Sequence, residues 1–252
     1  MKRFPKWLKW LLSIIGGLVL LIAVALLIVH ESKPEGQTGP EADALARKML
    51  QAVNKEAWDT TGIVRWNFND MHQYIWDKDR HWTIVEWGEH RAMFDINAIK
   101  GRAWKGGAEL EGSAAEKIVR KAWEYWCNDS FWLNAPVKAF DPGTSRSIVN
   151  QEDGSQALMV SYGSGGVTPG DSYLWILDEN GLPKAWKMWV KIIPFGGLEF
   201  SWENWKEVKG GARLAQLHNS SLFPLNITDI EAARDWQGMG MSADPFAPIV
   251  GK

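Results

Sequence analysis

Residues 63–96 read IVRWNFNDMHQYIWDKDRHWTIVEWGEHRAMFDI, in which short runs rich in apolar residues alternate with turn sequences. Val, Ile, Tyr and Trp are frequent in these runs, as they are in strands. Gly88-Glu89 places a glycine at the first central position of a connection, which suits a type II′ turn. A fifth run passes through Trp104. The pattern predicts an antiparallel meander whose first four strands are 63–68, 72–76, 81–87 and 90–96.

Two amphipathic helices are expected around this meander. Over residues 41–58, apolar side chains recur every four residues from Leu45 to Val53. A second helix is expected to open at Ser113, where Glu116 completes a capping box. Further strands are predicted after this helix, at 146–150, 156–162, 171–178, 184–193 and 197–206, with weaker candidates at 212–218 and 225–230.

Several of the later strands carry apolar side chains on both faces. Because side chains alternate along a strand, Trp175 and Leu174 are expected to point in opposite directions. The same holds for Trp186 and Trp189. An ordinary one-sided antiparallel sheet would alternate apolar and polar residues. A strongly curved sheet, covered outside by one element and inside by helices or an apolar ligand, explains the pattern, and a plain two-layer α+β core explains it as well.

Tryptophan is unusually frequent, with seventeen residues in the chain. Trp7 and Trp10 flank the apolar N-terminal run and fit an interfacial belt. The others are spread through the rest of the chain, where they either fill a core or line an apolar, ligand-holding concavity. The candidates for lining such a site are Trp66, Trp76, Trp82, Trp175, Trp186, Trp189 and Trp202.

Leu11–Val29 is a run of nineteen uncharged, mostly aliphatic residues that follows Lys2, Arg3, Lys6 and Lys9. As a helix it spans roughly 28 Å, about the hydrocarbon thickness of a bilayer. No A-x-A-like cleavage site follows the run, which favours a retained anchor over a cleaved signal peptide. The positive-inside rule then predicts a single-pass membrane protein whose N-terminus is in the cytoplasm and whose C-terminal domain lies outside the cytoplasmic membrane.

The rest of the chain divides into three parts. Residues 31–40, with two prolines and two glycines, predict a flexible linker. Residues 41–230 are enough for one domain with its own core. Residues 231–252 lack periodicity and are expected to be loosely ordered. The net charge of −2, without a basic block, argues against a nucleic-acid partner.

Signals for chemistry are weak. Asp129, Asp141 and Asp171 could converge beside a pocket as acid/base groups, or serve turns and helix ends. The single cysteine, Cys127, is either a nucleophile or a small apolar residue on a helix face. No H-E-x-x-H, C-x-x-C or G-x-S-x-G motif occurs. We therefore expect neither a metal site nor a cofactor.

Five strings resemble a set of uncharacterised bacterial envelope proteins: NDSFWL (128–133), FDPG (140–143), GGVTPGDSYLW (165–175), LDENGLPKAW (177–186) and KMWV (187–190). The order helix, meander, helix and further strands, with Gly181-Leu182-Pro183, also resembles the outer-membrane lipoprotein-sorting carriers, lipoprotein localisation factors A and B. That resemblance implies an α+β fold, an unclosed β-barrel of roughly 10–11 strands with helices on its concave side. It further implies an apolar cavity that receives acyl chains.

Three functions remain open from the sequence. The first is a membrane-anchored periplasmic domain that binds an acyl-chain lipid or a lipoprotein. The second is an envelope glycan- or lipid-acting hydrolase that uses Asp129, Asp141 and Asp171, although an enzyme is the less favoured class. The third is a ligand-free module that presents a sheet edge or the Gly-rich loop around residues 163–166 to a protein partner.

Overall fold

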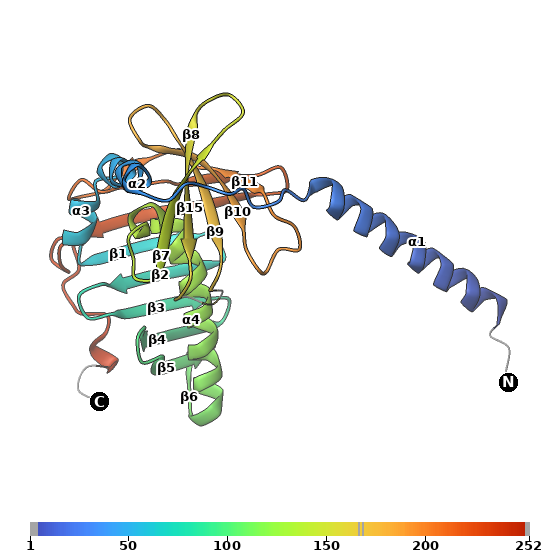
Figure 1. Cartoon of the computed structure of the whole chain (residues 1–252). Coiled ribbons are helices and arrows are strands. Elements are labelled where there is room, and N and C mark those ends of the chain that lie inside the picture. Colours follow the sequence, from blue (N-terminus) through green and yellow to red (C-terminus); the bar gives the residue numbers. More distant parts are fainter. Residues whose placement is uncertain (1–4, 166, 168, 250–252) are drawn as a thin grey trace.

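The computed structural model describes residues 5–165, 167 and 169–249. The described chain consists mostly of antiparallel strands with a few helices (Figure 1). The α-helices are α1 (Lys6–Val29), α2 (Pro40–Ala52), α3 (Lys55–Thr60) and α4 (Gly112–Asn134), and two 3₁₀ helices are η1 (Ala135–Lys138) and η2 (Ala247–Ile249).

The predicted meander forms the larger part of an eight-stranded sheet in the order β14-β15-β1-β2-β3-β4-β5-β6. All neighbouring strands in it are antiparallel, and the hairpin across Gly88-Glu89 pairs Trp87 with His90. The prediction of a meander is confirmed. It was possible from the sequence because each hairpin depends on local turn chemistry. The strands of this sheet are β1 (Ile63–Phe68), β2 (His72–Asp77), β3 (Trp82–Trp87), β4 (His90–Asp95), β5 (Lys100–Lys105), β6 (Ala108–Leu110), β14 (Leu217–Asn219) and β15 (Pro224–Ala233).

A second, five-stranded sheet has the order β11-β10-β9-β8-β7. Its strand β11 lies against β14 of the first sheet, since Glu203 bridges Leu217 and the backbone N–H of Asn219 donates to Ser201 Oγ at 2.9 Å. No pairing joins β6 to β7, so the described strands form no closed barrel. The remaining strands are β7 (Thr144–Asn150), β8 (Gln156–Tyr162), β9 (Ser172–Leu177), β10 (Pro183–Trp189), β11 (Leu198–Ser201) and the two-stranded ribbon β12 (Lys206–Glu207) and β13 (Arg213–Leu214).

The prediction of one helix over 41–58 is wrong, because the chain breaks it into α2 and α3 at Asn54. Asn54 adopts a left-handed conformation with φ 55°, and its side-chain oxygen accepts from the N–H of Ala57. Its side-chain amide donates to the carbonyl of Gly211 at 3.0 Å. Asparagine is one of the few residues that adopts this conformation readily, so it can end one helix and cap the next.

The predicted capping box of α4 is also wrong. The helix begins at Gly112, so Ser113 lies inside the first turn, and the N-cap residue Glu111 makes no side-chain capping bond. Gly112 has φ 53°, a conformation that glycine allows and that sets the direction of the chain into the helix.

The later strands carry apolar side chains on both faces, as the sequence predicts, and the meander does so as well. The main core lies between α4 and the sheets and contains Trp175 and Trp186. Leu174 belongs to a smaller cluster on the other face of the five-stranded sheet, with Trp189 packed against it. A third cluster covers the outer face of the meander and includes Ile84, Met93 and Phe246.

The described part of the C-terminal segment, residues 231–249, packs against the meander, in contrast to the expectation of a loosely ordered segment over 231–252, of which residues 250–252 lie outside the described residues. Residues 231–233 complete β15, and Phe246 is fully buried against Ile84 and Met93. The guanidinium of Arg80 donates to both oxygens of Asp244, at 2.6 and 2.9 Å. Trp236 and Ile249 pack on the same cluster, and Arg102 Nη1 donates to the carbonyl of Pro248 at 2.9 Å. Contacts with distant residues therefore hold the segment, and such contacts leave no periodic pattern in its sequence.

The segment between α1 and α2 is a strap rather than a flexible linker. We use the name strap for residues 30–37, which cross the five-stranded sheet from β10 to β7. The carboxylate of Glu31 accepts from Lys187 Nζ at 2.8 and 2.9 Å, and its carbonyl accepts from Trp189 Nε1 at 2.8 Å. Gln37 exchanges two backbone hydrogen bonds with Ile148, each 2.8 Å long. These bonds fix a segment whose composition alone is typical of flexible chain.

Helix α1 projects away from the rest of the molecule (Figure 1). Its segment Trp10–Val29 is long enough and apolar enough to cross a membrane.

Candidate functional site

The space between α4 and the two sheets is filled by aromatic side chains from all three. We call this set the aromatic core. Helix α4 contributes rings from its C-terminal half, and each sheet contributes rings from the face that it turns toward α4. Its members are Trp66, Tyr74, Trp76, Trp126, Phe131, Trp132, Tyr162, Tyr173, Trp175, Trp186, Phe200 and Trp202.

Trp186 on β10 lies at the centre of the aromatic core and is fully buried. Its ring centroid lies 4.7 Å from that of Trp132, 4.8 Å from Trp175 and 5.0 Å from Trp202. On the other side of α4, the rings of Trp126 and Trp76 meet edge to face at 5.2 Å. Such pairs stabilise by about 1 kcal/mol each beyond their buried area. The C-terminal half of α4 is therefore held to both sheets by ring contacts.

The aromatic core contains buried polar atoms that have no hydrogen-bond partner among the described residues. Six are indole N–H groups, which can only donate. Tyr162 adds an unpaired hydroxyl, and Asn134 adds an unpaired carbonyl oxygen. Leaving such a group unpaired costs about 1–3 kcal/mol. The six indoles belong to Trp66, Trp76, Trp126, Trp175, Trp186 and Trp202.

His218 on β14 adds a neutral imidazole to this interior. Its Nδ1 donates to the carbonyl of Ser201 at 3.2 Å, and its Nε2 is buried without a partner among the described residues. Burial lowers the pKa of His218 to about 4. Its ring meets that of Trp202 at 4.3 Å. The sequence did not single out His218, because residues 212–218 have a weak strand pattern and no partner motif.

Asp129 lies on α4 and is buried within a small polar cluster. Its Oδ2 accepts from the Tyr74 hydroxyl and lies near His72 Nδ1, both at 2.6 Å. Its Oδ1 accepts from the side-chain amide of Asn128 at 2.8 Å. The ring of Tyr125 covers His72 with centroids 4.0 Å apart. The cluster ties α4 to β2.

The other two candidate aspartates have different partners. Asp141 pairs with Lys138 one turn earlier, and its carbonyl accepts from the Thr144 hydroxyl at 2.8 Å. Asp171 is buried, and its Oδ1 accepts from the backbone N–H of Lys191 at 3.1 Å. Both arrangements are those of residues that order turns and strand ends. These contacts do not test a catalytic role of the three aspartates, which stays a prediction.

Five of the seven candidate tryptophans meet in the aromatic core, and two do not. Trp82 packs on the outer face of the meander, with its ring centroid 5.9 Å from that of Phe246. Trp189 lies on the far face of the five-stranded sheet and donates to the strap. Each of these two tryptophans lies an odd number of residues along its strand from a residue that faces the core. Its side chain therefore points to the opposite face of the sheet.

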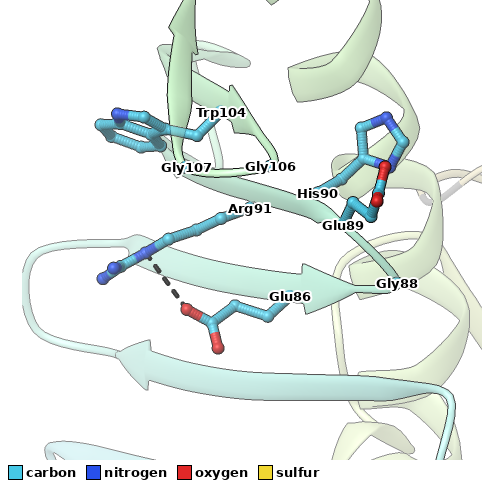
Figure 2. A pocket seen from close by; sticks show the side chains of 8 residues that line it. All are labelled: Glu86, Gly88, Glu89, His90, Arg91, Trp104, Gly106 and Gly107. Atoms are coloured by element: carbon cyan, nitrogen blue, oxygen red, sulfur yellow. Dashed lines mark ion pairs between the residues drawn. The ribbon is translucent and has the colours of Figure 1, made fainter.

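A surface hollow of about 510 Å³ lies where the β3–β4 and β5–β6 turns adjoin (Figure 2). Figure 2 shows Arg91 reaching toward Glu86, with Nε 3.2 Å from Oε1, below the ring of Trp104. The lining is open and mixed in charge. It consists of Glu86, Gly88, Glu89, His90, Arg91, Trp104, Gly106 and Gly107.

Within the described ranges, no three His, Cys, Asp or Glu side chains are arranged to hold a metal ion. Burial raises the pKa of the Cys127 thiol to about 12. A thiol with so high a pKa is a poor nucleophile at neutral pH, in agreement with the apolar interpretation of Cys127.

Comparison with known proteins adds little. No family model matches the chain, and no curated protein matches it. A solved structure of a DUF1329 family protein from Desulfovibrio piger is similar over 76% of this chain and 92% of its own, with 7% identity and a TM-score of 0.37. A similarity at that level supports no conclusion about the fold or the function of this chain.

Proposed function

We propose that this chain is a membrane-anchored protein whose domain binds an acyl-chain ligand, a lipid or a lipopeptide, in the aromatic core. Helix α1 is the anchor, and the domain lies on the periplasmic side of the cytoplasmic membrane. The proposal rests on the aromatic core and on the apolar length of α1.

The observation that carries the proposal is the set of six indole N–H groups that lie in one apolar interior and have no hydrogen-bond partner among the described residues. Buried polar groups in proteins are normally paired, so a cluster of unpaired donors marks a place where an acceptor belongs. A lipid or lipopeptide has apolar chains for the rings and ester or amide carbonyls for the N–H groups. A plain hydrocarbon would leave the donors unpaired.

Ligand entry requires α4 to separate from the sheets, since the rings now contact one another. Each buried methylene of a ligand contributes about 0.8 kcal/mol, so about ten methylenes contribute about 8 kcal/mol. Opening exposes buried ring area and also breaks ring pairs that stabilise by about 1 kcal/mol each beyond that area. A long acyl chain therefore offsets more of the cost of opening than a short one does.

The strap limits how far the domain moves from the membrane. His30, at the end of α1, is hydrogen bonded to Gly196, and Glu31 is bonded to β10 through Lys187. A shuttle between two membranes would need a long free tether. Local capture or sensing of lipid at the inner membrane fits these contacts better.

Native mass spectrometry of the full chain, purified from envelope material in detergent, tests the proposal. We expect a co-purifying acyl species near one per chain, identified after organic extraction. A chain that stays bare after incubation with phospholipid vesicles would contradict lipid binding.

Two matched tryptophan variants locate the ligand. Trp186→Ala removes a central ring of the aromatic core, whereas Trp189→Ala removes a ring on the far face of the same strand. We expect Trp186→Ala to weaken binding of a fluorescent fatty acid and Trp189→Ala to leave it near wild type. Equal losses of binding that match equal losses of folding would rule out the aromatic core as the site.

A further inference from the structure

The exposed apolar side chains of the domain gather at one end of its strands. Among the described residues that follow α1, six large apolar side chains are exposed, with exposed fractions from 36% to 70%. They belong to five separate connections between elements, so no single loop accounts for them. They are Met71, Phe140, Val167, Ile192, Leu222 and Phe223.

The strand registers place these connections at the same end. Phe68 pairs with both His72 and Ile227, so the β1–β2 turn lies beside the β14–β15 turn. The rings of Phe200 and Phe223 lie 5.6 Å apart, which places the β14–β15 turn beside the start of β11. The connection between β10 and β11, residues 190–197, therefore lies at this end as well.

The same register continues across the five-stranded sheet. Trp189 pairs with Ser172, so the loop before β9, which carries Val167, lies beside residues 190–197. Tyr162 pairs with Thr144, so the connection that carries Phe140 follows next. We call the row of these six side chains the apolar rim.

The opposite end of the strands has a different surface. Its turns are residues 78–81, 96–99, 151–155 and 178–182, and the structure describes all of them. None of them exposes a large apolar side chain. On an ordinary protein surface, exposed apolar residues occur singly and are scattered, whereas these six side chains all lie at one end of the strands.

Helix α1 joins the domain at the end that bears the apolar rim. The C-cap residue of α1 is His30, and its Nδ1 accepts from the backbone N–H of Gly196 at 3.0 Å. The next residue, Glu31, donates its backbone N–H to the carbonyl of Gly196 at 2.9 Å. Ile192, the most exposed of the six, lies in the same connection, four residues before Gly196.

We propose that the apolar rim docks on the lipid surface that α1 enters, with Ile192 and Leu222 inserted at the boundary between headgroups and acyl chains. This inference rests on the proposed anchoring of α1 and is independent of ligand binding in the aromatic core. His30, the residue that follows α1, is hydrogen bonded to Gly196 and so keeps the apolar rim next to the end of the helix. The rim therefore faces the bilayer when α1 is embedded. Isolated apolar side chains at such a boundary are buried among lipid tails.

The polar hollow of Figure 2 marks the limit of the docked surface. It lies at the same end of the strands as the rim, on the strands from β3 to β6 that follow β2 in the sheet and are farther from α1, and its lining includes Glu86 and Glu89. Docking therefore involves the part of this end between Phe140 and Met71.

Single-cysteine variants of the full chain test the docking, in a Cys127→Ala background labelled with the fluorophore NBD. The chain is reconstituted in vesicles of phosphatidylethanolamine and phosphatidylglycerol. Ile192→Cys and Leu222→Cys report on the rim, Asn180→Cys reports on the opposite end, and Leu20→Cys reports on α1. We expect the two rim labels and the Leu20 label to shift to shorter wavelengths and to be quenched by spin-labelled lipids, while the Asn180 label stays unshifted and unquenched.

The other outcomes separate the two proposals. A shielded Leu20 label with rim labels that behave like the Asn180 label would refute docking and leave the anchor intact. An unshielded Leu20 label would refute the anchor, and docking with it. Rim labels that shift to shorter wavelengths without quenching by lipid would show that a second copy or another protein covers the rim, which also overturns docking.

Discussion

The carboxylate of Asp129 on α4 lies 2.6 Å from Nδ1 of His72 on β2. The same carboxylate oxygen accepts from the Tyr74 hydroxyl, and Asp129 is only 2% exposed. This is a direct polar connection between the helix and the eight-stranded sheet. Elsewhere in the described interface, ring contacts such as Trp126–Trp76 hold α4 in place.

We expect Asp129→Asn to lower the free energy of unfolding by about 2–3 kcal/mol, because a neutral amide cannot accept charge-assisted bonds from both neighbours. Urea unfolding of the two proteins measures the difference. Asp141→Asn is the matched control, and its half-exposed pair with Lys138 predicts a loss of less than about 1 kcal/mol. Intact stability of Asp129→Asn, with loss of a measurable hydrolytic activity, would instead support the catalytic hypothesis.

The burial of His218 leads us to expect that the fold loses stability at acidic pH. Its pKa is lowered to about 4 in the folded chain and is about 6.5 in the unfolded chain, so only the unfolded chain takes up the proton between these values. Stability is therefore full above about pH 6.5 and falls as the pH drops toward 4, by on the order of 3 kcal/mol. We expect His218→Phe to remove this part of the pH dependence in thermal unfolding curves. An unchanged slope between pH 6.5 and 4 would assign the dependence to other groups.

The strap predicts slow hydrogen exchange at Gln37, whose N–H is bonded to the carbonyl of Ile148. A Cβ at Gly36 would lie 2.9 Å from that carbonyl oxygen, so Gly36→Ala should release this end of the strap. Faster exchange at Gln37, measured by mass spectrometry, is the expected result. Thr38→Ala, at an exposed neighbouring position, is the control and should leave the exchange unchanged. Equal exchange in both variants and in the wild type would mean that the strap is not held at β7.

Phe246 predicts that the C-terminal segment contributes to stability. It is fully buried, and Phe-to-Ala changes at buried sites cost about 3–5 kcal/mol. We expect Phe246→Ala to lower the melting temperature markedly. Phe223→Ala removes the same ring from a half-exposed turn and should change the melting temperature little. Similar effects of the two substitutions would contradict the docking of the C-terminal segment.

Local elements were predictable where the turn chemistry and the alternation of side chains agree. The predicted bounds of β1 and β8 coincide with the observed ones, and most of the other predicted strands differ by a few residues at their ends. Two predictions are wrong: 197–206 runs past the end of β11 to the start of β12, and 212–218 covers β13 and the start of β14. Both signals act between near neighbours in sequence, so the rest of the fold does not alter them. The opposite directions of Trp186 and Trp189 follow from the same alternation.

Contacts between distant segments were not predictable in this way. Asn54 breaks a helical pattern because it can bond to Gly211, and the strap is ordered because β7 and β10 offer it partners. The alternation of side chains shows which residues of a strand share a face with Trp66 or with Trp82, but it does not show which of the two faces meets α4. That depends on the long-range packing of the helix.

From the sequence alone follow the apolar N-terminal helix, the meander, the later strands and the abundance of large rings, since each depends on composition or on local periodicity. The tertiary structure decides which five candidate tryptophans share one interior, and that His218 joins them. It also decides that the six exposed apolar side chains lie at the end of the strands that adjoins the end of α1. Their proximity results from strand order and register, which link residues far apart in the chain.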